Sequence, residues 1–68
     1  MGYRIEFEGL ESYIEDEDLK EETFDVCFGS SMMVKFQVNE DLITAINGVD
    51  GWGNNIREQV YGKEAKIY

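Results

Sequence analysis

Three stretches of the chain alternate between apolar and polar residues, which predicts three β-strands. Successive side chains of a strand point to opposite faces, so each stretch has one apolar and one polar face. A weaker alternation at residues 64–68 predicts a short fourth strand at the sheet edge, with Ala65 and Ile67 facing inward. The three principal strands are predicted at residues 3–8, 23–28 and 32–38.

The second and third of these strands are predicted to form a hairpin around residues 29–31. A three-residue loop places Phe28 opposite Met32, so that the apolar side chains of both strands share one face. A two-residue loop would set the apolar residues of one strand on the polar face of the other. The three-residue loop also predicts that Cys27 lies opposite Met33 as a small apolar spot on the outer face.

Apolar residues at helical spacing predict two short helices after the third strand. Asn39 suits a helix N-cap before an acidic first turn, so we expect a helix over residues 40–47 that ends at Gly48. A second helix is expected over residues 55–61, with Asn54 or Asn55 as its cap.

Together these elements predict an α+β fold: a three- or four-stranded antiparallel sheet with one or two short helices packed on one face. The length of 68 residues predicts one domain, over residues 1–68. The acidic segment 11–22 is expected to join the first strand to the second at one edge, as a short helix or a loop. Trp52 is assigned to the core, because so small a domain needs each large side chain, with an interface anchor as the alternative.

The composition excludes most catalytic and metal-binding chemistry. The chain has no histidine, and Cys27 is its one cysteine, so neither a Ser-His pair, a Cys/His zinc site nor an intrachain disulfide is available. Residues 50–54 lack the ligand spacing of a calcium loop. No apolar run approaches the roughly 18 residues of a membrane span. We therefore expect a cytoplasmic protein that is not an enzyme, with no cofactor, metal or membrane contact.

The negative charge is concentrated in the first half of the chain. The net charge is −9, and residues 1–34 contain ten acidic residues against Arg4 and Lys20. An acidic run of this density is either a solvated face that serves solubility or an interaction surface for a basic partner. The candidate partner-binding residues are Glu11, Glu15, Asp16, Glu17, Asp18, Glu21 and Glu22.

Grooves of Lys and Arg that hold nucleic acid accept carboxylates as well as phosphates. The predicted function is therefore to bind and inhibit a basic nucleic-acid-binding protein or nuclease complex, with no direct contact to nucleic acid. In being short, acidic and histidine-free, the chain resembles small phage-encoded anti-defence proteins such as anti-CRISPR proteins and anti-restriction DNA mimics. This resemblance covers composition only and assigns no residue a role; it implies action in the cytoplasm of a host cell.

The alternative function is a protein-interaction module, such as an antitoxin or an accessory subunit, that binds through an apolar strand or helix face. The secondary candidates for such a face are Cys27, Met33 and Trp52. Salt separates the two functions, because added ions screen a charged interface and leave an apolar one nearly unchanged. The sequence does not specify an oligomeric state.

Overall fold

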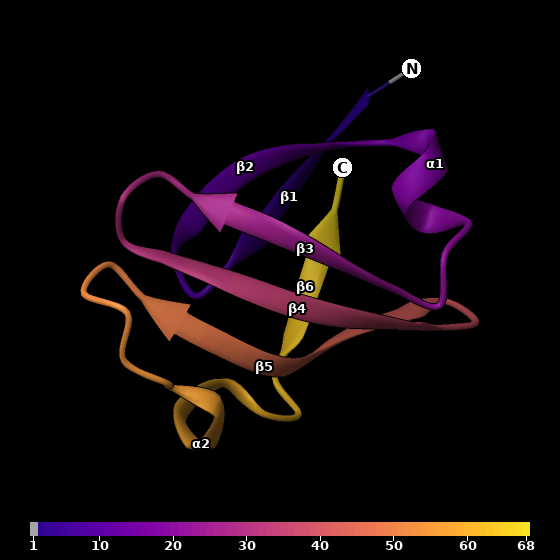
Figure 1. Ribbon diagram of the computed structural model, residues 1–68. Coiled ribbons are helices and arrows are strands. Elements are labelled where there is room, and N and C mark those ends of the chain that lie inside the picture. Colours follow the sequence, from indigo (N-terminus) through magenta and orange to yellow (C-terminus); the bar gives the residue numbers. More distant parts are fainter. Residues whose placement is uncertain (1) are drawn as a thin grey trace.

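The computed structural model describes residues 2–68 and shows an antiparallel sheet that curls into a nearly closed barrel (Figure 1). Its elements are β1 (Gly2–Phe7), β2 (Leu10–Glu15), α1 (Asp16–Leu19), β3 (Thr23–Phe28), β4 (Met32–Asn39), β5 (Leu42–Asp50), α2 (Arg57–Val60) and β6 (Glu64–Ile67). The strand order is β2-β1-β6-β5-β4-β3. The predicted α+β fold, with helices packed on one face of a smaller sheet, is therefore wrong: the chain is mainly β.

The acidic segment 11–22 begins as a strand and is not one loop or helix. β2 pairs with β1 along its length, through a two-residue turn in which Glu8 and Gly9 have φ of 49° and 80°. Such left-handed pairs suit tight hairpins because their twist matches that of the strands. Leu10 and Ile14 fall on the inner face, whereas Tyr13 is exposed, so their apparent helical spacing is misleading. Only Asp16–Leu19 forms a single helical turn.

The β3–β4 hairpin confirms the register predicted from the apolar pattern. Phe28 pairs with Met32, and Cys27 pairs with Met33. The alternation along β3 is complete, with Phe24, Val26 and Phe28 buried and the residues between them exposed.

The helix predicted over residues 40–47 is instead the strand β5. Asn39 pairs with Leu42, and Glu40 adopts a left-handed φ of 52° in the turn between them. The error has a physical cause in a β-bulge. Lys35 pairs with Asn47 and the next residue pairs with Ala45, so that Ile46 is an extra residue on β5. A bulge interrupts the strict period of two, and the resulting spacing of apolar residues imitates a helix.

The C-terminal elements also differ from expectation. β6 is not an edge strand, because it lies between β1 and β5. It thereby joins the β1–β2 hairpin to the sheet of β3, β4 and β5. The helix expected over residues 55–61 is the single turn α2. Its residue Val60 is 4% exposed and belongs to the core, so α2 packs against the core beside β5.

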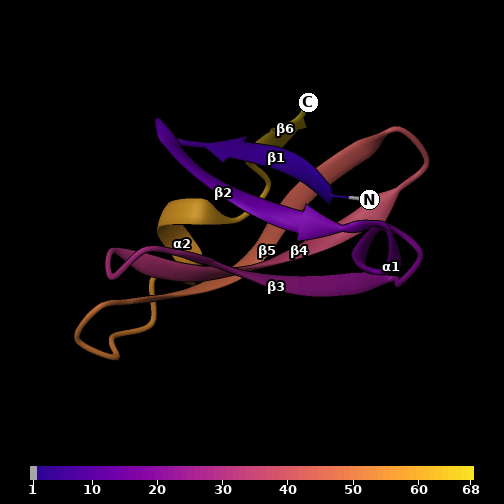
Figure 2. The same ribbon diagram turned by 90° about the horizontal axis from the view of Figure 1, so that it is seen from above.

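The barrel closes where β2 and β3 lie side by side, a boundary that we call the seam (Figure 2). Among residues 2–68 no backbone ladder joins these strands. The Ser12 hydroxyl donates a hydrogen bond to the Cys27 carbonyl at 3.0 Å and bridges them. Inside, the rings of four phenylalanines pack at centroid distances of 5.1–6.2 Å. They are Phe7, Phe24, Phe28 and Phe36.

Candidate functional site

Six of the seven acidic candidates surround the end of the seam at α1, whereas Glu11 lies at the other end of β2, next to Ser12, whose hydroxyl donates a hydrogen bond to the Cys27 carbonyl. Glu11 and Glu15 occupy the outer face of β2, and the other five belong to α1 or to the turn that leads into β3. α1 joins the ends of β2 and β3 in Figure 2. We call this set the acidic surface: Glu11, Glu15, Asp16, Glu17, Asp18, Glu21 and Glu22.

Some members of the acidic surface also hold the fold together. Arg4 Nε lies 3.6 Å from Glu11 Oε1 across the β1–β2 hairpin. Asp18 Oδ2 accepts the Glu15 backbone N–H at 2.9 Å and caps α1. The Tyr3 hydroxyl donates to Asp16, and this hydrogen bond raises the pKa of Tyr3 and lowers the pKa of Asp16. These three carboxylates already have partners within the chain.

Glu17, Glu21 and Glu22 differ because they are exposed and form no salt bridge within residues 2–68. Between residues 10 and 28 the sequence supplies eight acidic residues and only Lys20 as a cation. The three glutamates are therefore the part of the acidic surface most available to a basic partner.

Several of the cations are engaged away from α1. Lys63 forms a salt bridge with Glu8. The guanidinium of Arg4 lies over the ring of Tyr68, and that of Arg57 lies over Tyr61. Cation–π contacts of this kind hold the charge at a fixed place. The negative charge around α1 is consequently not balanced by these groups.

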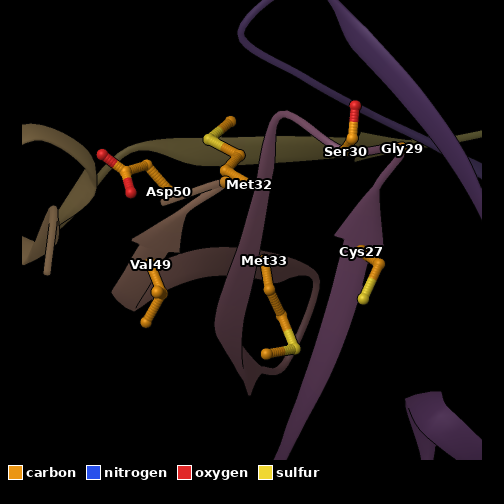
Figure 3. A pocket seen from close by; sticks show the side chains of 8 residues that line it. Cys27, Gly29, Ser30, Met32, Met33, Val49 and Asp50 are labelled. Atoms are coloured by element: carbon orange, nitrogen blue, oxygen red, sulfur yellow. The ribbon is translucent and has the colours of Figure 1, made fainter. Parts of the chain in front are cut away.

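The secondary candidates gather at the opposite end of β3 from α1. Cys27, Met33 and Val49 are neighbours in the register of β3, β4 and β5. They line a shallow apolar hollow of about 280 Å³ and project to the same side of the sheet, as Figure 3 shows. A second hollow adjoins the first through Ser30 and Gly51 and is lined by Trp52. Sequence reasoning missed Val49, because the bulge in β5 conceals its outward position.

Trp52 is not a core residue, contrary to the prediction, because 89% of it is exposed. It lies on a loop that Asp50 organises. Asp50 Oδ1 accepts the backbone N–H groups of Trp52 and Asn54, both at 2.9 Å, and Oδ2 accepts the Asn54 side-chain amide at 3.3 Å. These bonds, with the Asn54 backbone N–H first, lower the pKa of Asp50. The loop is therefore ordered by an ionised carboxylate.

We expect Asp50→Asn to destabilise the domain at pH 7 and to have no effect in strong acid. The pKa of Asp50 is lower in the folded chain than its ordinary value of 3.8. Its ionised form therefore stabilises the fold above that value, and this contribution is lost as the pH falls through the lower, folded-state pKa. Urea unfolding between pH 2 and pH 7 measures the difference between wild type and variant.

Asp41→Asn is the matched control for this measurement. It removes the same charge from an exposed residue whose side chain forms no salt bridge within residues 2–68. Its difference from wild type is expected to stay nearly constant over this pH range. A difference for Asp50→Asn that did not shrink with falling pH would contradict the assigned role of the carboxylate.

Among residues 2–68, no group of three or more metal-ligating side chains is arranged to hold a metal ion. The same residues contain no helix of the length and apolarity that a membrane span requires. No protein-family model, curated protein or solved structure matches the chain.

Proposed function

We propose that this protein inhibits a basic nucleic-acid-binding protein, or a nuclease complex, by presenting the acidic surface where the partner would hold phosphates. The observation that supports this proposal is the exposure of Glu17, Glu21 and Glu22 without salt bridges in residues 2–68. Carboxylates make short, charge-assisted hydrogen bonds to Arg and Lys, as phosphates do. The net charge of −9 also attracts a basic partner from a distance.

The backbone that carries these glutamates is held in place on both sides. Lys20 N donates to Glu17 O, and Glu21 N donates to Asp18 O, both at 3.2 Å. Val38 N donates to Glu22 O at 2.9 Å and ties the end of this segment to β4. A charged surface on an ordered backbone loses less conformational entropy on binding than a disordered acidic tail does. This order favours a binding surface over a merely solubilising run.

The test is affinity capture from nuclease-treated bacterial lysate, comparing wild type with the triple variant Glu17→Gln, Glu21→Gln, Glu22→Gln. We expect wild type to retain a nucleic-acid-binding protein at low salt and to release it to added duplex DNA or to high salt. If each lost charge pair is worth about 0.5 kcal/mol, the triple variant binds this partner about tenfold more weakly.

The control is the triple variant Asp41→Asn, Glu58→Gln, Glu64→Gln, which changes the net charge equally at exposed sites away from the acidic surface. It should bind nearly as well as wild type. Equal losses in the two triple variants would show that only total charge matters. A partner that survives both high salt and added DNA would contradict the proposal and favour the alternative, an interaction module with an apolar interface.

A further inference from the structure

The outer face of β3, β4 and β5 changes character along its length. In the register of these strands, Thr23, Gln37 and Thr44 form one row. The next row on this face consists of Asp25, Lys35 and Asn47, and the last consists of Cys27, Met33 and Val49. Only the last row is apolar, and it is also the row that is hollowed (Figure 3). Among these three rows, the apolar one is therefore the row next to the loop that carries Trp52.

Trp52 is held in its exposed position by a well-ordered loop. Besides the side-chain bonds of Asp50, Asp50 N donates to Asn54 O at 2.9 Å, and Gly53 N donates to Asp50 O at 3.1 Å. Gly51 lies so close to the Ser30 carbonyl that the two turns brace each other. A tryptophan presented on an ordered loop beside an apolar hollow has the character of an interface anchor, because large aromatic side chains dominate binding energy.

Charge decides which partner suits this end of the barrel. A second copy of the chain would bring another net charge of −9, so self-association is opposed by repulsion. Asp50, which is ionised, lines the same hollow as Met33. The outer face of β3 runs from the hollow at Cys27 to the acidic surface at Glu22, about 16 Å at 3.3 Å per residue. A basic partner complements both ends.

We propose that the hollow and Trp52 are the apolar anchor of the interface whose charged part is the acidic surface. The partner is a basic protein segment that seats an apolar side chain between Cys27, Met33 and Val49 and packs against Trp52. Its Lys and Arg residues lie about 16 Å away, against Glu17, Glu21 and Glu22. This inference rests on the proposed function, and it adds the partner's apolar residue and the spacing of that residue from the basic cluster.

Two synthetic peptides test the inference. The first carries six arginines in a Gly/Ser background, and the second is identical except for two adjacent leucines five residues from the arginines. We expect the leucine peptide to bind about tenfold more tightly, which corresponds to about 1.4 kcal/mol. Because Trp52 is the only tryptophan, its emission reports the anchor directly. It should shift to the blue and resist acrylamide quenching with the leucine peptide alone.

Variants of exposed residues separate the two parts of the interface. Met33→Thr and Trp52→Ser, followed by anisotropy of labelled peptide, should abolish the advantage of the leucines and leave binding of the arginine peptide unchanged. The triple variant Glu17→Gln, Glu21→Gln, Glu22→Gln should weaken both peptides equally and keep the advantage of the leucines.

The other outcomes overturn the inference in distinguishable ways. Equal binding of both peptides with unchanged Trp52 emission would show that the hollow and Trp52 are not an anchor, and the acidic surface alone would form the interface. If salt and the triple variant left the affinity of the leucine peptide unchanged, the partner would not be basic, and the proposed function would fail with it. If Trp52 emission shifted with protein concentration in the absence of peptide, the hollow would be occupied by a second copy of the chain and not by a basic partner. Failure of either peptide to bind would overturn the inference, while DNA competition would decide the proposed function separately.

Discussion

Replacing Phe36 with alanine is expected to leave the domain unfolded at 25 °C. Phe36 is fully buried, and its ring contacts three other phenylalanines at centroid distances of 5.1–6.2 Å. Truncation of a buried Phe costs about 3–5 kcal/mol, from lost transfer free energy and the cavity left behind. A core of this size rarely supplies more than about 3–5 kcal/mol in total. The loss therefore matches the whole stability of the fold.

Amide dispersion in NMR spectra and urea unfolding followed by circular dichroism measure this effect. Trp52 emission is a poor reporter of folding, because the side chain is already 89% exposed in the native state. Phe36→Leu should remain folded, since it keeps most of the apolar volume. Tyr13→Ala removes an aromatic residue that is 78% exposed and should cost less than about 1 kcal/mol. A cooperative transition near the wild-type midpoint for Phe36→Ala would show that these rings do not form the centre of the core.

The sequence predicts the parts of the fold in which local pattern and pairing agree. β1, β3 and β4 follow from strict alternation, and the β3–β4 register follows from parity alone, because one register puts every apolar residue on one face. The failures occur where the period of two is broken. Ile46 in the bulge displaces the alternation of β5, and exposed Tyr13 completes a false helical pattern with Leu10 and Ile14 in β2. Barrel closure depends on long-range pairing, which no local pattern contains.

The sequence likewise predicts only part of the candidate site. The acidic run is visible in the sequence, but its available part is not, because the partners of Asp16 and Asp18 depend on the capping of α1 and the position of Tyr3. The general need of small domains for large side chains predicts that Trp52 lies in the core. The barrel meets that need with four phenylalanines, and a loop ordered by Asp50 holds the tryptophan outside. The net charge of a segment follows from its sequence, whereas the exposure of each side chain depends on the fold.

Gly51→Ala is expected to lower the free energy of unfolding by about 1–3 kcal/mol, the usual cost of inserting atoms where there is no space. Chain entropy alone predicts the opposite sign: Gly51 is not left-handed, and replacing such a glycine with alanine typically stabilises by about 0.4–1 kcal/mol. A side-chain carbon at residue 51 would, however, collide with the carbonyl oxygen of Ser30. That carbonyl belongs to a turn closed by the bond from Ser31 N to Phe28 O at 3.1 Å, so it cannot withdraw freely.

Urea unfolding of Gly51→Ala, alone and combined with Ser30→Gly, tests whether chain entropy or the collision decides the sign of the change in the free energy of unfolding. Because the obstacle is backbone, removing the Ser30 side chain should not rescue stability, whereas a side-chain collision would be relieved. The same substitution should displace Trp52 and remove the leucine advantage in peptide binding. A Gly51→Ala variant at least as stable as wild type would show that the two turns do not brace each other. In that case Trp52 would lose the support that makes it an ordered anchor.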